Sequence, residues 1–165
     1  MSVQIIKHEG GLYSLYAKQT VAKEIDLIWD FFRKPRNLNK LTPEDVEFKI
    51  ISGNSDDFYE GKIISYKIKP FKMINFNWVT EISQVKEGSY FVDNQIFGPY
   101  NMWHHEHHFK SNGDGTTDII DKVKYKLPFY ILGGLMHKMF IRKKLFNIFM
   151  FRQKKINDLF NIPQL

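Results

Sequence analysis

Two histidines and an acid with strand-like spacing are the side chains most suited to chemistry in this chain. His105 and His107 lie two apart in a segment that alternates like a β-strand, and Asp93 and Gln95 do the same in the segment before it. Side chains two apart on a strand share a face. Each pair therefore shares its face with large aromatic residues such as Trp103. A face that mixes acid, amide, imidazole and aromatic rings suits the wall of a pocket.

The turn between these two segments decides which of their side chains meet. A three-residue loop at 98–100 would place Asp93 opposite His105 and Gln95 opposite Trp103. A two-residue loop would oppose residues of different parity and separate the two sets. We favour the first register because it lets an acid meet an imidazole, and the sequence leaves both open.

Three roles are open to His105 and His107. The first is metal binding, since both could reach one ion with Asp93 or Asp121 as a third ligand. This spacing is common by chance in a histidine-rich strand, so we predict no metal ligand. An imidazole bonded to an acid in an apolar pocket could act as a general base near neutral pH. That role makes His105, His107 and Asp93 the candidate catalytic residues. The third and simplest role is structural, in which buried polar groups satisfy one another beneath the sheet.

Hydrophobic periodicity predicts the elements that hold these residues. Alternating segments indicate strands, and Ile25, Ile28, Trp29 and Phe32 have the spacing of a helix. Consecutive strands joined by short loops form an antiparallel meander. The expected elements are a strand at 13–20, a helix at 24–32, a short helix at 36–40, strands at 47–52, 62–69, 75–85, 90–97, 101–110 and 116–127, and a long helix at 132–160.

Composition narrows the classes of protein to which the chain can belong. Its 165 residues suffice for one domain with a sizeable core, and we expect a single domain over 1–165. The absence of cysteine excludes disulfides and thiolate chemistry. We see neither a signal peptide nor an apolar run of about 18 residues that could span a membrane. A cytoplasmic protein is therefore expected.

The net charge of +6 is concentrated near the C-terminus. Such a cluster can attract nucleic acid or an anionic membrane, but the solvated face of an amphipathic helix explains it more simply. We expect no specific nucleic-acid partner, and leave open a weak membrane contact and a monomeric or homodimeric state. The basic residues are Lys138, Arg142, Lys143, Lys144, Arg152, Lys154 and Lys155.

Local motifs and the order of elements over 13–160 together carry a family resemblance. The motifs lie at 29–32, 37–43, 91–95, 98–100, 103–107 and 121–128. On these residues the chain resembles the SRPBCC ligand-binding domains of the START-like superfamily, which includes the birch pollen allergen and polyketide cyclase-like proteins. The resemblance implies the α+β helix-grip fold. In that fold a curved seven-stranded antiparallel sheet wraps around a long C-terminal helix, with two short helices after the first strand. It also implies a hydrophobic cavity between sheet and helix.

We therefore expect the chain to bind or carry a hydrophobic or amphipathic small molecule of lipid, polyketide or isoprenoid type, without a cofactor. A cyclase, aromatase or hydratase that uses a cavity His–Asp pair is the first and less favoured alternative. Peripheral membrane association through the basic C-terminal helix is the second. The expected ligand-contacting residues are Tyr66, Trp78, Thr80, Asp93, Gln95, Trp103, His105, His107, Phe109, Asp121, Tyr125, Leu135 and Met139.

Overall fold

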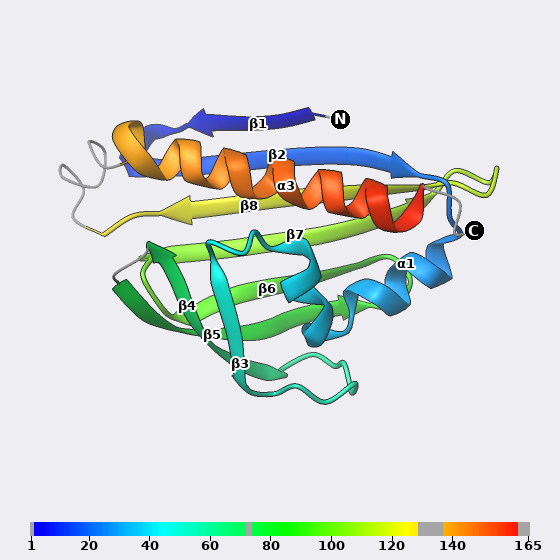
Figure 1. Cartoon of the computed structure of the whole chain (residues 1–165), viewed down its shortest axis with the longest axis horizontal. Helices are drawn as coiled ribbons and strands as arrows, with labels where there is room; N and C mark the ends of the chain where they lie inside the picture. Colours follow the sequence, from blue (N-terminus) through cyan, green and yellow to red (C-terminus); the bar gives the residue numbers. More distant parts are fainter. Residues whose placement is uncertain (1, 72–73, 129–136, 162–165) are drawn as a thin grey trace.

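A computed structural model describes residues 2–71, 74–128 and 137–161 (Figure 1). Within these ranges the strands form one antiparallel sheet of eight, in the order β1-β2-β8-β7-β6-β5-β4-β3. The elements are β1 (Ser2–Lys7), the 3-10 turn η1 (Glu9–Gly11), β2 (Leu12–Val21), α1 (Ile25–Phe32), the 3-10 helix η2 (Pro35–Leu41), β3 (Glu47–Ser52), β4 (Ile63–Phe71), β5 (Ile74–Lys86), β6 (Tyr90–Phe97), β7 (Met102–Ser111), β8 (Thr117–Lys126), the π-helical turn η3 (His137–Ile141) and α3 (Arg142–Phe160).

The expected helix-grip architecture is confirmed, but the expected count of seven strands is wrong by one. The additional strand is β1, which pairs with β2 from Ser2 opposite Lys18 to Lys7 opposite Tyr13. Only Val3 and Ile5 of β1 turn inward, where they pack against the core. Two inward side chains in six residues are too short a pattern to identify an edge strand from sequence.

Helix α3 packs against one side of the sheet's concave face. It contacts β1, β2 and η2, and Figure 1 shows it lying across β2 and β8. Its buried stripe includes Leu145, Phe149, Ile156 and Phe160, which have helical spacing. The long helix was expected to begin at 132; residues 129–136 lie outside the described part, and η3 precedes α3.

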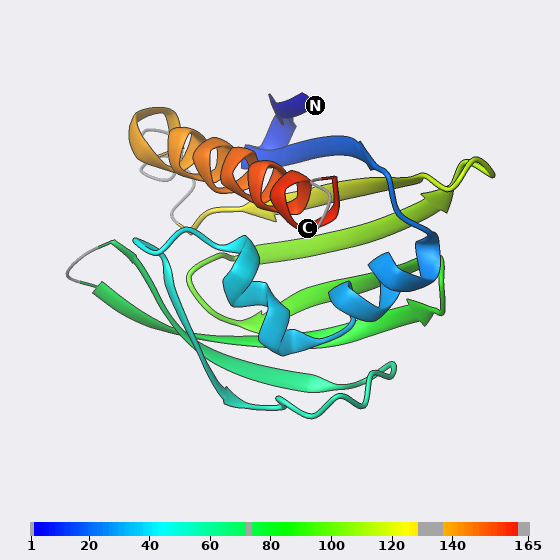
Figure 2. The same ribbon diagram turned by 45° about the vertical axis from the view of Figure 1, so that its right-hand side comes forward.

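Helices α1 and η2 cover the middle of the same face. Both views show them on the side of the sheet that α3 occupies (Figures 1 and 2). Trp29 of α1 packs edge-on against Phe58, Phe91 and Phe109. Pro35 begins η2, a position where its missing N–H costs no helical hydrogen bond.

Strands β4 and β5 carry a third apolar cluster that no residue of α3 joins. Its buried members are Ile64, Tyr66, Ile68, Trp78 and Ile82. The other two buried clusters each include residues of α3. The helix therefore fills the β2–β8 side of the concave face and leaves space in front of the β4–β5 side.

Candidate functional site

A cavity of about 490 Å³ occupies the space between β3–β6 and the helices. Its volume lies in the usual range of small-molecule sites. Its wall is mainly apolar. Its polar side chains include a cluster around Asp93, and Arg33, Lys34, Asn37 and Lys144 from the helical elements and their flanks also line it. Apolar contributions come from η2 (Leu38, Leu41), β3 (Phe48), β4 (Ile64, Ile68), β5 (Phe76, Trp78, Ile82), β6 (Phe91) and α3 (Leu145, Ile148, Phe149).

Aromatic rings form the part of the wall nearest the β6–β7 hairpin. The ring centroids of Trp78 and Trp103 are 5.4 Å apart and nearly perpendicular, and Tyr100 lies 4.9 Å from Trp103. The Trp78 Nε1 donates to Thr80 Oγ1 at 2.9 Å. Burial raises the pKa of Tyr66 and of Tyr100. Both phenols therefore stay protonated and can donate hydrogen bonds into the cavity.

The hairpin has the register that brings an acid to an imidazole. Asp93 pairs with His105, as the three-residue loop predicts, and the ladder ends one pair later at Asn94 and His104. The expected pairing of Gln95 with Trp103 is not part of this ladder.

Gln95 closes the loop instead. Its Nε2 donates to the Tyr100 carbonyl at 2.7 Å, and its Oε1 accepts from the Tyr100 N–H at 3.2 Å. A Cβ on Gly98 would lie 2.4 Å from Gln95 Oε1. Only glycine at position 98 therefore leaves Gln95 room to make both hydrogen bonds undisturbed.

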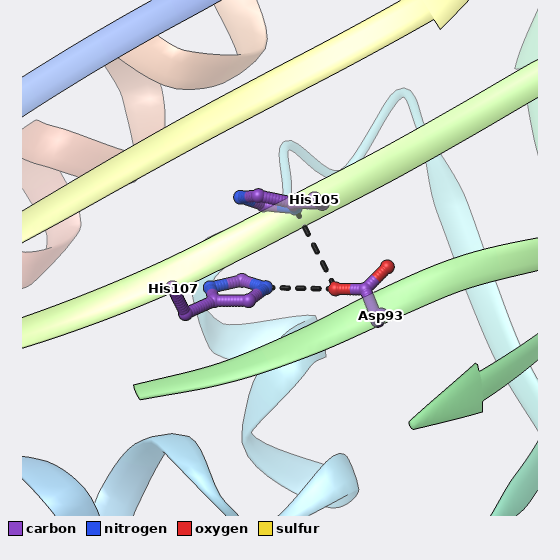
Figure 3. A group of neighbouring side chains, drawn as sticks. All are labelled: Asp93, His105 and His107. Atoms are coloured by element: carbon purple, nitrogen blue, oxygen red, sulfur yellow. Dashed lines mark hydrogen bonds and ion pairs between the residues drawn. The ribbon is translucent and has the colours of Figure 1, made fainter. Parts of the chain in front are cut away.

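His105 and His107 point from β7 toward Asp93 on β6 (Figure 3). The Nε2 atom of His107 lies 2.8 Å from Asp93 Oδ2, and the Nδ1 atom of His105 lies 3.6 Å from the same oxygen. The two imidazole centroids are 3.7 Å apart, and the ring planes are inclined by 33°. All three side chains line the cavity, so this cluster forms its polar end.

Asp121 of β8 and Arg152 of α3 contact the imidazole nitrogens that do not face Asp93, and Arg152, whose Nη2 lies 3.3 Å from His107 Nδ1, also lines the cavity. Asp121 Oδ1 is 3.0 Å from His105 Nε2 and 3.1 Å from His107 Nδ1. The Arg152 guanidinium donates to both oxygens of Asp121, at 3.1 and 3.2 Å. A bidentate pair of this kind is among the stronger polar contacts in proteins. Both residues are buried.

The network sets the charge of its acids. Burial acts to raise the pKa of Asp121, but Arg152 and the two imidazoles hold it well below its usual range. Burial also acts to raise the pKa of Asp93, and the hydrogen bond from His107 outweighs that effect, so the pKa is lowered. Both carboxyls are therefore ionised at neutral pH.

The two imidazoles differ in basicity although they are neighbours. Burial, followed by repulsion from His107, lowers the pKa of His105. Burial acts in the same direction on His107, but hydrogen bonds with Asp121 and Asp93 raise its pKa above the usual value. His107 is accordingly the more basic of the two, and His105 is neutral at neutral pH.

The structure brings together about half of the residues expected to contact a ligand. Those that line the cavity are Tyr66, Trp78, Thr80, Asp93, Trp103, His105 and His107. Asp121 lies behind the imidazoles, and Leu135 falls outside the described residues.

Four expected positions need correction because other elements fill the space in front of them. Gln95 bonds the hairpin loop. Phe109 is covered by Trp29 and Phe32 of α1, and Tyr125 bonds His137 in the β2–β8 core. Met139 is 56% exposed on the outer side of η3.

Arg152 is the functional residue that sequence reasoning placed wrongly. We assigned it to a solvated basic face, yet it is only 7% exposed. Helical phase contained the signal, because Arg152 follows Leu145 and Phe149 on the stripe that continues to Ile156. The tyrosine of the hairpin loop, Tyr100, was also missed as a wall residue.

The antiparallel sheet, the helix α3 packed against it and the cavity between them define the helix-grip fold of START-like proteins, in agreement with the resemblance seen in the sequence. No protein-family model matches the chain, and no curated protein matches it significantly. Solved structures of low sequence identity share the fold over almost their full length.

Three such structures show the range of proteins with this fold. Major latex-like protein 151 of Panax ginseng has a TM-score of 0.66 and 11% identity, over 93% of this chain and 100% of its own. A START superfamily protein of Mycobacterium smegmatis has a TM-score of 0.65 and 9% identity, over 90% and 97%. A norcoclaurine synthase point mutant of Thalictrum, in complex with a transition-state analogue, has a TM-score of 0.59 and 13% identity, over 95% and 99%.

Among the helices that the structure describes, none combines the length and apolar character needed to cross a membrane.

Proposed function

We propose that this chain binds one small molecule with an apolar skeleton and a single polar end in the cavity beside α3. The observation that carries the proposal is the asymmetric lining of that cavity. Apolar side chains of η2, β3–β5 and α3 surround most of it, the buried cluster of Asp93, His105 and His107 lies at one end, and the cations Arg33, Lys34 and Lys144 also line it. Sites for small molecules commonly combine an apolar wall with a few placed polar groups.

Two phenol hydroxyls on the cavity wall indicate what the ligand must supply. The hydroxyls of Tyr66 and Tyr100 have no hydrogen-bond partner among the residues that the structure describes, and both side chains line the cavity. A hydroxyl that a ligand covers without giving it a hydrogen-bond partner costs free energy. An oxygen-bearing head that accepts from one of these hydroxyls fits such a site, while the skeleton packs against Trp78 and Trp103. Lipids, polyketides and isoprenoids all include molecules of this kind.

Strand β4 provides a matched pair of variants for testing the cavity. Ile64 faces the cavity and is 2% exposed, whereas its neighbour Ile63 is 44% exposed on the opposite face. Ile64→Trp fills cavity space, and Ile63→Trp adds the same ring outside it.

The wild-type protein and the Ile63→Trp variant are expected to retain co-purifying small molecules in native mass spectrometry and to bind a fluorescent apolar probe. Ile64→Trp is expected to lose both. The proposal is rejected if the wild-type protein retains no molecule and takes up no probe, or if Ile64→Trp binds as the wild type does.

An enzyme that uses the same cluster is a second candidate, because both imidazoles line the cavity and lie within hydrogen-bond reach of an acid. His105 would be the base, since its Nε2 faces Asp121 while its Nδ1 faces the cavity end. This assignment makes Asp121 the orienting acid, in place of the expected Asp93.

A reaction of this type is proton removal beside a carbonyl, as cyclases and hydratases require. The test is exchange of α-hydrogens for deuterium in a panel of apolar ketones. His105→Gln is expected to abolish exchange that the wild type catalyses. Exchange by the wild type that persists in His105→Gln, or no exchange with any ketone, excludes His105 as the base.

A further inference from the structure

The two imidazoles of the site are oriented by a single carboxylate oxygen. Asp121 Oδ1 lies 3.0 Å from His105 Nε2 and 3.1 Å from His107 Nδ1. The opposite ring nitrogens, His105 Nδ1 and His107 Nε2, are the ones that face Asp93, at 3.6 and 2.8 Å from its Oδ2 (Figure 3). One acid therefore lies behind both rings and the other lies in front of them.

This orientation directs electron pairs toward one point. His105 hydrogen-bonds Asp121 through Nε2, so its Nδ1 carries a lone pair. His107 Nδ1 lies 3.1 Å from Asp121 Oδ1 and 3.3 Å from Arg152 Nη2, and His107 Nε2 carries a lone pair when Nδ1–H donates to Asp121. One ring nitrogen of His105, one of His107 and a carboxylate oxygen of Asp93 all lie within 4.8 Å of one another. Three electron-pair donors that converge in a buried site repel one another unless a positive centre lies between them. A proton shared by His107 and Asp93 can serve as that centre, and so can a metal ion.

We propose that His105 Nδ1, His107 Nε2 and the Asp93 carboxylate bind one divalent transition-metal ion of the zinc type, with an open coordination position that faces the cavity. Zinc bonds of about 2.0–2.1 Å at tetrahedral angles place ligand atoms about 3.3 Å apart. Asp93 Oδ2 lies 2.8 Å from His107 Nε2 and 3.6 Å from His105 Nδ1, one distance below that value and one above it. The proposal rests on this geometry and stands independently of ligand binding in the cavity.

Asp121 and Arg152 supply the outer shell that metal sites usually have. A metal-binding histidine commonly donates its remote N–H to a carboxylate, which fixes the tautomer and the ring orientation. Here one carboxylate serves both histidines. The Arg152 guanidinium in turn holds Asp121 through both of its oxygens. The His105 ring is therefore held by Asp121, and the His107 ring by Asp121 and Arg152, before an ion arrives. Such preorganisation distinguishes the site from a chance His-x-His spacing on a strand.

The charge of the cluster identifies the group that would complete the coordination. With both imidazoles neutral, Asp93, Asp121 and Arg152 leave one negative charge, so a divalent ion makes the cluster positive by one. An anionic oxygen in the open position restores neutrality, and it can come from hydroxide or from a carboxylate, enolate or phenolate head of a cavity ligand. All three metal-binding side chains line the cavity, so that head can reach the ion.

A second histidine group on the outer face of β7 provides the control. His108 Nε2 lies 2.8 Å and His104 Nε2 3.4 Å from Glu106, and these side chains are only half-buried. Surface groups of this type take up metal adventitiously. The reference protein for the test is therefore the double variant His104→Ala/His108→Ala, which removes the surface group and leaves the cavity cluster intact.

Metal binding is measured by titrating chelator-treated reference protein with Zn²⁺ in a calorimeter and with Co²⁺ in a visible spectrophotometer. We expect one equivalent of either ion, with Co²⁺ showing the absorption of a low-coordinate nitrogen–oxygen site. His105→Ala and His107→Ala are each expected to abolish saturable binding. Asp121→Asn, which changes only the outer shell, should weaken binding by roughly 10–100-fold.

The absence of saturable binding in both the wild type and the reference protein overturns the proposal, whatever the other variants do. The proposal is also overturned if the reference protein loses the binding that the wild type shows, while His105→Ala made in the wild type keeps it. The surface group is then the site. If a histidine variant fails to fold, Asp93→Asn replaces it, since this change preserves shape while removing the ligand charge. Uptake of an apolar probe is recorded on the same samples, so that failure of the metal site and failure of the cavity are separate results.

Discussion

Arg152 provides the sharpest test of how the buried cluster is held together. Arg152→Met removes the guanidinium and keeps an unbranched side chain of similar reach. The change leaves Asp121 buried without the two hydrogen bonds of 3.1 and 3.2 Å that it receives from α3. We expect a large loss of stability without loss of the fold.

The size of that loss follows from two independent arguments. Unit charges about 4 Å apart interact by about 4 kcal/mol at an effective dielectric constant of about 20. Removal of one partner of a buried pair typically costs about 3–5 kcal/mol. Asp121 keeps its contacts with His105 and His107, which favours the lower end. We therefore expect a loss of about 3 kcal/mol, which corresponds to a fall in Tm of roughly 6–12 °C for a chain of this length.

Urea unfolding followed by circular dichroism measures this loss as a shift in midpoint at constant slope. Lys154→Met removes an exposed cation two residues along the same helix and should change stability by less than about 0.5 kcal/mol. The double variant Asp121→Asn/Arg152→Met removes both charges and should recover more than half of the loss, because no unpaired charge then remains buried. A single variant within about 1 kcal/mol of the wild type, or a double variant no better than the single, refutes the reasoning.

Three further changes test other parts of the molecule. Burial, with the nearby cations, lowers the pKa of His137 from 6.5 to about 4; its neutral form thus stabilises the fold above pH 6.5. The wild type should lose about 1–2 kcal/mol, after allowance for solvent screening, between pH 6.5 and pH 4 relative to His137→Gln, and equal pH profiles would contradict this. Gly98→Ala should lower the free energy of unfolding by roughly 1 kcal/mol, because Gln95 must give up a hydrogen bond. Gln95→Ala should lower it by about the same amount. A double variant whose loss equals the sum of the two would show that the two residues do not interact. Phe146 and Met150 are exposed on a lysine-rich face of α3, so Phe146→Ser/Met150→Ser should weaken binding to anionic vesicles, and an absence of wild-type binding at low salt would exclude membrane association.

Local patterns were sufficient for most of the fold. The spacing of Ile25, Ile28 and Trp29 identified α1, and the alternation in 90–97 and 101–110 identified both strands of the central hairpin. Such signals lie within a few residues of one another, so they survive without tertiary information. The β1 strand was missed because its six residues turn only two side chains inward.

The composition of the site depended on contacts that no local pattern contains. Asp121 meets His107 because β7 and β8 pair with those residues opposite each other, and Arg152 reaches Asp121 only through the packing of α3. Phe109 and Tyr125 have the parity of cavity residues, but α1 and the β2 core cover them. Strand parity thus predicts which face a side chain takes, whereas the helices decide which part of that face stays open.

The position of the charged cluster follows from that division of the concave face. On one side, α3 packs against the sheet, and the buried Asp121 remains ionised there because Arg152 and the two imidazoles lower its pKa. On the other side, the sheet faces the cavity, and Asp93 has a more exposed side chain, 17% against 6% for Asp121. The two imidazoles lie between these environments and contact both acids. The closed half of the cluster therefore orients the rings, and the open half presents Asp93 and the free nitrogen of His105 to whatever enters the cavity.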